Sequence, residues 1–222
     1  MPTRPYYEED GITIYHGDSR EILPAIEFVR VMVTDPPYGI GYNSGWAGRL
    51  PRRITGDETA ELRNWAIRAW LPRPLACFAT WRCVPPEPPR GCLVWHKSAG
   101  GMGDLDFPWS PTFEMIWVYG EGWFGFRGDA VLTGRTVVSW NSGPAARSHP
   151  HEKPVDVLAQ IIEKSPPGAV IDPFMGSGST LVAAKLAGRR AIGIEIEERY
   201  CEIAVKRLAQ GVLPLEEPSH AH

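Results

Sequence analysis

The chain has 222 residues, of which 43% are hydrophobic and 22% are charged, and its formal net charge is −3. This is the composition of a folded globular protein with a sizeable core, and it excludes a disordered or fibrous chain. No apolar run reaches the roughly 18 residues of a membrane helix, and no basic and apolar leader opens the sequence, so we expect a cytoplasmic protein that contacts no membrane. The four cysteines form no CxxC pair and the histidines have no ligand spacing, so we expect no metal site.

Positive charge is concentrated in the middle of the chain. Residues 49–97 hold nine Arg and Lys against four Asp and Glu, whereas the remainder of the chain has more acidic than basic residues. A basic segment in an acidic protein is typical of a localised surface that binds a polyanion. A solvated surface that is merely rich in arginine has the same composition, so charge alone does not decide between them.

The first elements form a β-α-β unit. Residues 12–15 are expected to form a strand, and Ser19 is expected to cap a helix over 20–26. The apolar, β-branched run 28–34 then forms a strand that ends where Asp35 is followed by two prolines. Strands joined through a helix in this way belong to a parallel sheet.

The remaining elements continue this alternation. The middle of the chain is expected to hold a helix over 57–70 and strands at 75–80, 91–95 and 113–119. The last third is expected to hold helices over 153–164, 179–186 and 198–208, and strands at 169–172 and 190–194. These elements predict a single α/β domain over 1–210, built on a doubly wound, mostly parallel sheet of seven strands. Small insertions at about 39–56 and 98–148 and a disordered tail at 211–222 complete the expected organisation.

A Gly-rich loop links the strand 169–172 to the helix that follows. It reads Asp172-Pro173-Phe174-Met175-Gly176-Ser177-Gly178. The two glycines let the backbone approach a ligand, and the helix N-terminus offers free N–H groups. Glu195 ends the next strand, where a carboxylate can accept hydrogen bonds from both hydroxyls of a ribose. This arrangement indicates a nucleoside-binding site.

Two related Gly-rich motifs fit the loop less well. A nicotinamide-type fingerprint requires a third glycine, but Leu181 stands at that position. A P-loop requires a lysine before the Ser or Thr, and the loop has none. A tight turn with only a structural role is the remaining alternative, and it does not account for the acidic residue that ends the following strand.

The tetrapeptide Asp35-Pro36-Pro37-Tyr38 directly follows the strand 28–34. The two prolines fix the backbone and remove two N–H donors, which leaves carbonyl oxygens and a carboxylate beside an aromatic ring. Such a set suits a planar amino group, which donates to the oxygens while its ring stacks on tyrosine. A solvated proline turn would be the preferred interpretation of Asp-Pro-Pro alone, but not beside Tyr38 and a nucleoside loop.

With these two motifs the chain resembles the DNA amino-methyltransferases, whose D/N/S-P-P-Y/F/W and F-x-G-x-G motifs lie on one doubly wound sheet. The matching residues are Asp35 to Tyr38 and Phe174 to Gly178, and the stretches Gly17-Asp18 and His149-Pro-His-Glu-Lys-Pro154 resemble the same group. The catalytic motif precedes the cofactor loop, which is the order of the circularly permuted β group. The resemblance covers about residues 12–208 and implies a Rossmann-like fold that uses S-adenosylmethionine.

The resemblance also implies a role for each matched residue. The expected catalytic residues are Asp35, Pro36, Pro37 and Tyr38. The expected cofactor-binding residues are Asp18 at the adenine, Glu195 at the ribose, Lys153 at the methionine carboxylate, and Asp172, Pro173, Phe174, Gly176, Ser177 and Gly178 in the loop. The implied reaction is N6-methylation of adenine in duplex DNA after the base is extruded. Cytosine N4 and RNA are the alternative targets, because both bases carry an amine beside a ring nitrogen.

Recognition of the target sequence is expected outside the core sheet. Arg49, Arg52 and Arg53 in the first insertion are candidates for contacts with phosphates or guanine edges, although any single arginine is more often simply solvated. Neither insertion is long enough for a large recognition domain. We therefore expect a short target, relaxed specificity, or a homodimer that enlarges the DNA footprint.

Overall fold

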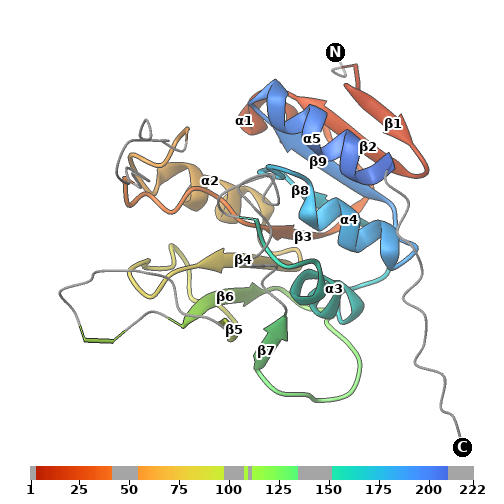
Figure 1. The fold of residues 1–222 in the computed structure, drawn as a ribbon. Coiled ribbons are helices and arrows are strands. Elements are labelled where there is room, and N and C mark those ends of the chain that lie inside the picture. The colour runs from red at the N-terminus through yellow and green to blue at the C-terminus, as the bar shows by residue number, and fades with distance from the viewer. Residues whose placement is uncertain (1–3, 42–54, 98–107, 110–111, 135–151, 210–222) are drawn as a thin grey trace, which may run out of the picture.

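The computed structural model describes residues 4–41, 55–97, 108–109, 112–134 and 152–209, which form a mixed sheet with helices on both faces (Figure 1). The strands are β1 (Tyr7–Glu9), β2 (Ile12–His16), β3 (Val29–Thr34), β4 (Leu75–Ala79), β5 (Gly91–Lys97), β6 (Phe113–Tyr119), β7 (Val131–Gly134), β8 (Ala169–Asp172) and β9 (Ala191–Glu195). The helices are α1 (Ser19–Ile22), α2 (Glu61–Trp70), α3 (Val155–Glu163), α4 (Ser179–Leu186) and α5 (Glu198–Ala209), and a 3-10 turn, η1, spans Leu23–Ala25.

The strand order is that of a doubly wound sheet. Across the sheet the strands follow the order β1-β2-β9-β8-β3-β4-β6-β5-β7. Strands β2, β9, β8, β3 and β4 run parallel, and β6 runs antiparallel between β4 and β5. These seven strands are the ones predicted from the sequence, and the half that contains β3 and β4 precedes the half that contains β8 and β9 along the chain.

Two further strands, β1 and β7, extend the edges of the sheet and were not predicted. β1 pairs antiparallel with β2 through a turn in which Asp10 and Gly11 have φ angles of 50° and 75°. Its sequence Tyr-Glu-Glu is largely exposed, so no alternation of apolar residues marks it as a strand. β7 pairs parallel with β5 and consists of only four residues, Val-Leu-Thr-Gly, inside the region assigned to the second insertion.

Some helix boundaries differ from the predicted ones. The N-cap of α1 is Asp18 rather than Ser19, because the Asp18 carboxylate accepts a hydrogen bond from the Arg20 N–H at 2.8 Å. Helix α2 begins at Glu61 instead of 57. The reason is that Asp57 turns towards the tetrapeptide 35–38, where its Oδ1 accepts the Gly39 N–H at 2.7 Å.

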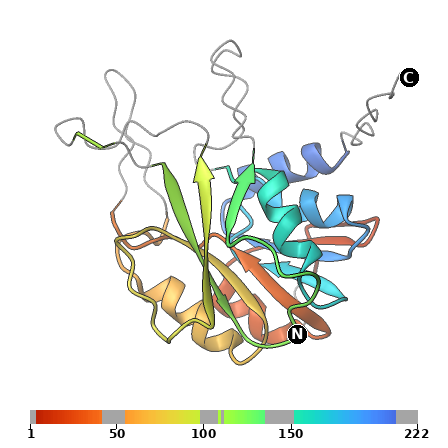
Figure 2. The ribbon, with the colours of Figure 1, turned by 90° about the horizontal axis from the view of Figure 1, so that it is seen from below.

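The core lies in two layers, one on each face of the sheet (Figures 1 and 2). Helices α3, α4 and α5 cover one face, and α1 and α2 cover the other. The amphipathic pattern of α3 is typical of such a helix: it buries Val157, Leu158, Ile161 and Ile162. Among the described residues, no helix is long and apolar enough to cross a membrane.

The topology creates a switch point between β8 and β3. From β8 the chain passes through α4 to β9 on one side, and from β3 it passes through α2 to β4 on the other. Neighbouring strands whose connections leave in opposite directions open a crevice at their carboxyl ends, which is where doubly wound folds bind ligands. Asp35 follows β3 and Asp172 ends β8, so both sequence motifs reach this crevice.

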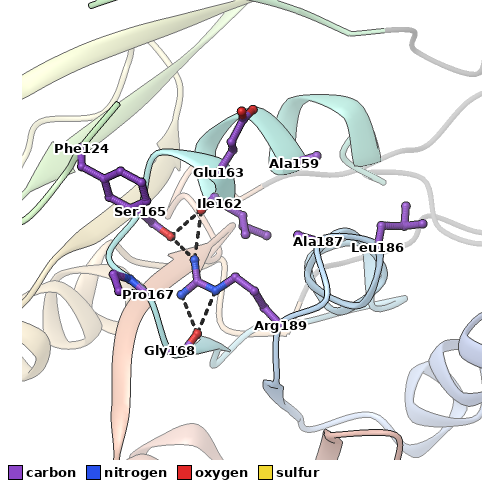
Figure 3. A pocket seen from close by; sticks show the side chains of 10 residues that line it. All are labelled: Phe124, Ala159, Ile162, Glu163, Ser165, Pro167, Gly168, Leu186, Ala187 and Arg189. Atoms are coloured by element: carbon purple, nitrogen blue, oxygen red, sulfur yellow. Dashed lines mark hydrogen bonds between the residues drawn. The ribbon is translucent and has the colours of Figure 1, made fainter. Parts of the chain in front are cut away.

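A cavity of about 570 Å³ lies at the opposite edge of the sheet, between the C-terminal ends of α3 and α4 (Figure 3). The Arg189 side chain lies along it and donates hydrogen bonds to the carbonyls of Ile162 and Gly168 and to the Ser165 hydroxyl. Gly168 precedes β8, so the cavity is separated from Asp172 by the length of that strand. Arg189 serves there to satisfy the carbonyls of a turn, and we assign the reaction to the other edge.

Candidate active site

The two sequence motifs are joined by a direct hydrogen bond. Thr34, the last residue of β3, donates from Oγ1 to Asp172 Oδ1 at 2.7 Å. Asp172 Oδ1 also accepts the Phe174 N–H at 3.0 Å, and its Oδ2 accepts the Thr180 hydroxyl at 2.7 Å. Burial raises the pKa of Asp172 to about 6. Asp172 thus fixes the start of the Gly-rich loop to the strand that carries Asp35.

The Asp35 carboxylate lies in a cluster of charged groups. Its Oδ1 accepts the Tyr38 hydroxyl at 2.7 Å, and its Oδ2 lies 2.6 Å from Lys153 Nζ. Glu114 lies on the other side of both donors, with Oε2 at 3.3 Å from the Tyr38 hydroxyl and 3.2 Å from Lys153 Nζ. Lys97 Nζ completes the cluster at 2.6 Å from Glu114 Oε1. Asp35 remains able to accept further donors, because a carboxylate offers about four lone-pair positions.

The tetrapeptide is held in place by a buried arginine on α2. Arg63 is only 2% exposed, and its guanidinium donates to the Tyr38 carbonyl at 2.9 Å and to the Val84 carbonyl at 3.2 Å. Gly39 then turns the chain with a φ of 74°, and a Cβ at this position would lie 2.3 Å from the Ala60 backbone nitrogen. A cavity of about 330 Å³ opens beside Tyr38 and Arg63. The position of Tyr38 is therefore fixed from α2.

Replacement of Arg63 by Met should destabilise the protein and lower its catalytic rate. The Met side chain is nearly as long as the aliphatic part of Arg, but it leaves the Tyr38 carbonyl without its guanidinium partner. The loss of this hydrogen bond costs about 1–3 kcal/mol. Urea unfolding measures the loss of stability, and the turnover number per folded protein measures the displacement of Tyr38. Arg68→Met is the matched control, because Arg68 lies on the same helix but is exposed and pairs with Glu87. An unchanged turnover number in Arg63→Met would count against a positioning role.

The Gly-rich loop and Glu195 form a second site beside the first. Glu195 is 9% exposed, and its carboxylate accepts the Gly176 N–H at 3.0 Å and the Glu197 N–H at 2.8 Å. Burial raises the pKa of Glu195 to about 6. Gly176 has a φ of 51°, and a Cβ there would meet no other atom within 4 Å. The open space above Gly176 and the unused lone pairs of Glu195 fit the ribose of a nucleoside cofactor.

The beginning of α4 is anchored to α5. Gly178, the N-cap of α4, has a φ of 81°, and a Cβ at this position would lie 2.8 Å from the Ala204 Cβ. Arg207 of α5 donates to the Ser177 carbonyl at 2.8 Å and to the Ser177 hydroxyl at 2.9 Å. The second glycine therefore permits close packing of two helices, whereas Gly176 is the one that faces open space.

Asp18 and its neighbours lie against the same loop. The Ser19 hydroxyl donates to the Pro173 carbonyl, and the Gly17 N–H donates to the Glu195 carbonyl at 2.9 Å. The Asp18 carboxylate forms an ion pair with Arg20 at 2.6 Å, and the hydrogen bond from Arg20 lowers the pKa of Asp18. The structure thus brings Asp18, the loop and Glu195 together at one edge of the sheet.

Lys153 and the three arginines of the first insertion are the remaining predicted site residues. Lys153 lies at the catalytic tetrapeptide, 8% exposed, with its ammonium between Asp35 and Glu114. The candidates Arg49, Arg52 and Arg53 lie outside the described residues, as do most of the two insertions and the tail. Within the described residues, no group of three or more His, Cys, Asp or Glu side chains is arranged to hold a metal ion.

Three residues of the site were missed in the sequence. Glu114 is the second residue of β6, and Lys97 is the last residue of β5. Glu114 was interpreted only as part of the strand 113–119, and Lys97, which lies beyond the predicted strand 91–95, was counted only in the basic middle segment, although a charged residue at the end of an apolar strand was a usable signal. Arg63 was counted only as part of the basic middle segment, and its burial could not be inferred from composition.

The doubly wound fold and the two joined sites are those expected of an enzyme with a nucleoside cofactor on one half of the sheet and a planar amine substrate on the other. The DNA methylase family matches residues 106–206. A type II methyltransferase, M2.DpnII of Streptococcus pneumoniae, is 49% identical over 94% of this chain and 93% of its own length. The DNA adenine methyltransferase YhdJ of Escherichia coli K12 is 26% identical over 93% of this chain and 85% of its own length.

Two solved structures have the same fold. The M1.HpyAVI–SAM complex superposes with a TM-score of 0.62 at 24% identity, over 89% of this chain and 98% of that chain. The PvuII DNA methyltransferase, which is cytosine-N4-specific, superposes with a TM-score of 0.70 at 15% identity, over 95% and 91%. The chain belongs to the DNA methylase family. It is a DNA methyltransferase that depends on S-adenosylmethionine.

Proposed function

We propose that this protein transfers a methyl group from S-adenosylmethionine to the N6 amino group of adenine in duplex DNA. The observation that carries the proposal is the position of the Asp35 carboxylate, which follows β3, contacts the Tyr38 hydroxyl at 2.7 Å and is coupled through Thr34 to the cofactor loop. The alternative target is the N4 amino group of cytosine, because the PvuII DNA methyltransferase, which is cytosine-N4-specific, has a similar fold. The aspartate in the tetrapeptide favours adenine, because serine is commoner there among the cytosine enzymes.

We assign the cofactor to the Gly-rich loop and Glu195. S-adenosylmethionine supplies an electrophilic methyl group on a sulfonium ion. Phe174 to Gly178 would surround its methionine part, while Glu195 would accept the ribose hydroxyls and Asp18 would contact the adenine. Pro173 and Asp172 would hold the start of the loop against β3. Lys153, which the resemblance places at the methionine carboxylate, is held between Asp35 and Glu114, so we assign it to the tetrapeptide and not to the cofactor.

The chemistry at the tetrapeptide follows from the properties of an aromatic amine. Its lone pair is delocalised into the ring, which makes it a poor nucleophile. Hydrogen bonds from the amino group to Asp35 and to the Pro36 carbonyl favour a pyramidal nitrogen, and Tyr38 holds the ring by stacking. Pro37 keeps the turn rigid. Catalysis then comes from positioning and electrostatics, without a covalent intermediate on the protein.

The target base must leave the DNA helix before it reaches Asp35. Its amino group is paired inside the duplex, so extrusion costs a few kcal/mol of stacking and pairing. Arg49, Arg52 and Arg53 are the candidates for holding the DNA backbone, and a homodimer would enlarge the footprint. Parallel assays with duplex DNA, single-stranded DNA and RNA would show which form of nucleic acid the enzyme prefers.

Hydrolysates of DNA methylated by this protein should contain N6-methyladenine. Mass spectrometry of the nucleosides after incubation with isotopically labelled S-adenosylmethionine measures the product directly. Label found only in N4-methylcytosine would refute adenine as the target. DNA incubated without the protein provides the blank, and Asp35→Ala distinguishes transfer by this site from contaminating activity.

A further inference from the structure

Glu114 reaches the active site because β6 runs against its neighbours. β6 is antiparallel to β4, with Met115 opposite Ala79, the last residue of β4. The start of β6 therefore lies at the same edge as the carboxyl ends of β3, β4 and β8, where Asp35 is found. The Glu114 side chain is only 15% exposed. A carboxylate in such a place requires partners, because burial of an unpaired charge is costly.

The two donors that hold Asp35 are also the donors that contact Glu114. The Tyr38 hydroxyl lies 2.7 Å from Asp35 Oδ1 and 3.3 Å from Glu114 Oε2. Lys153 Nζ lies 2.6 Å from Asp35 Oδ2 and 3.2 Å from Glu114 Oε2. One oxygen of Glu114 is thus a second, longer-range acceptor for both groups that bind the catalytic carboxylate. Lys97 holds the other oxygen of Glu114 at 2.6 Å.

The four charges of this cluster balance. Asp35 and Glu114 are opposed by Lys97 and Lys153, which alternate with them in space. Burial raises the pKa of Glu114, but Lys153 and Lys97 outweigh it and bring the pKa down to about 2. Burial lowers the pKa of Lys153, but Asp35 and Glu114 outweigh it and raise the pKa above its usual range. Near neutral pH, Glu114 is therefore an anion and Lys153 a cation.

The contacts of Asp35 with Tyr38 and Lys153 oppose its expected role in methyl transfer. The target amino group has to donate a hydrogen bond to a carboxylate that already accepts from Tyr38 and Lys153. A cation that is bound tightly to Asp35 weakens it as an acceptor and repels the positive sulfonium. Glu114 Oε2, at 3.3 Å from the Tyr38 hydroxyl and 3.2 Å from Lys153 Nζ, is a second acceptor for both donors.

We propose that Glu114 is a positioning residue for methyl transfer, which shares Lys153 and the Tyr38 hydroxyl with Asp35 and so keeps Asp35 available to the target amino group. The proposal rests on the assignment of Asp35 and Tyr38 as the residues that hold that group. Glu114 acts through Lys153 and Tyr38 and does not itself touch the reacting atoms. Its influence is therefore expected in the turnover number and not in cofactor affinity.

Glu114→Gln tests the proposal. The variant keeps the shape of the side chain but loses its charge, so Lys153 binds Asp35 alone. We expect the turnover number on duplex DNA to fall by roughly 10- to 100-fold, less than the roughly 10²- to 10³-fold of a group at the reacting atoms, because Glu114 acts through its neighbours. The dissociation constant of S-adenosylmethionine should stay within about twofold, because Glu114 contacts Tyr38, Lys153 and Lys97 and not the Gly-rich loop. Glu87→Gln is the matched control, because Glu87 forms an exposed ion pair with Arg68.

A double variant distinguishes the sharing of Lys153 and Tyr38 by the two carboxylates from a simple effect of the net charge of the cluster. Glu114→Gln leaves the cluster with one excess positive charge, whereas Glu114→Gln combined with Lys97→Gln restores neutrality and should also fold if the single variant does not. Sharing requires the double variant to remain slow, and Glu114→Asp to recover part of the rate. A wild-type turnover number in Glu114→Gln, or its full recovery in the double variant, would overturn the proposal. Failure of the wild-type protein to methylate DNA, or an active Asp35→Ala variant, would instead refute the assignment of the site.

Discussion

Replacement of Asp35 by Asn should lower methyl transfer to duplex DNA by roughly 10²- to 10³-fold, the size of the loss when one preorganised polar group is removed from an active site. An amide offers one acceptor oxygen where the carboxylate offers two, and its NH₂ group is a donor. With the oxygen retained opposite the Tyr38 hydroxyl, the NH₂ group faces the Lys153 ammonium, where donor meets donor. The target amino group then lacks its charged acceptor.

Transfer of labelled methyl groups under single-turnover conditions measures this effect without interference from product release. Cofactor affinity is the internal control, because Asp35 follows β3, whereas the Gly-rich loop follows β8 and Glu195 ends β9. A rate within about threefold of the wild-type rate in Asp35→Asn would show that the charge of this carboxylate is not required for the reaction, since the loss of a charged hydrogen bond is worth more than that. Glu87→Gln again serves as the surface control.

The sequence predicted the fold well because its strongest signals are local. Strand β3 is a continuous β-branched run that stops at Pro36 and Pro37, and such a pattern has few other interpretations. The interval between Asp172 and Glu195 allows one turn, one helix and one strand, which the structure shows as α4 and β9. The edge strands escaped prediction because β1 and β7 are short and half-exposed, so burial leaves no periodic pattern in them.

The active site was predictable only in part, because its charged neighbours come from distant strands. Asp35 and Tyr38 stand within one tetrapeptide and can be recognised together. Glu114 meets Tyr38 across 76 positions of sequence, through the antiparallel pairing of β6 with β4. That pairing cannot be read from the local pattern of either strand. Lys153 was predicted to be functional, yet its position beside Asp35 depends on the entry into α3.

The hydrogen bond between Thr34 and Asp172 fixes the two halves of the candidate active site relative to each other. Thr34 immediately precedes Asp35, and Asp172 immediately precedes the Gly-rich loop, so a displacement of one strand relative to the other moves the acceptor relative to the cofactor. Both side chains are buried, at 1% and 3% exposure. If the methyl donor binds at the loop and the amine at Asp35, as we propose, one contact in the core would set their positions relative to each other.

Affinity for S-adenosylmethionine should depend on pH through Glu195. Burial raises the pKa of this carboxyl to about 6, so it is largely protonated at pH 5 and ionised at pH 7.5. Ribose hydroxyls donate more strongly to the carboxylate, which means that cofactor binding favours the ionised form and lowers the pKa. The dissociation constant should therefore decrease as the pH rises from 5 to about 6.5 and level off above that. A change of roughly threefold to tenfold corresponds to a pKa shift of up to about one unit on binding.

Glu195→Gln removes the charge at every pH and separates this effect from other ionisations. At pH 7.5 the variant should bind S-adenosylmethionine roughly 10- to 100-fold more weakly, because a hydrogen bond to a charged group contributes about 1.5–3 kcal/mol. Its affinity should also lose most of the dependence on pH, as measured by calorimetric titration from pH 5 to 7.5. Asp172 is the other group that could cause this dependence on pH, since burial raises its pKa to about 6 as well. Its oxygens already accept three hydrogen bonds from Thr34, Phe174 and Thr180, whereas those of Glu195 retain room for two hydroxyls. A pH dependence that persists in Glu195→Gln and disappears in Asp172→Asn would transfer the effect to Asp172 and remove Glu195 from the ribose site.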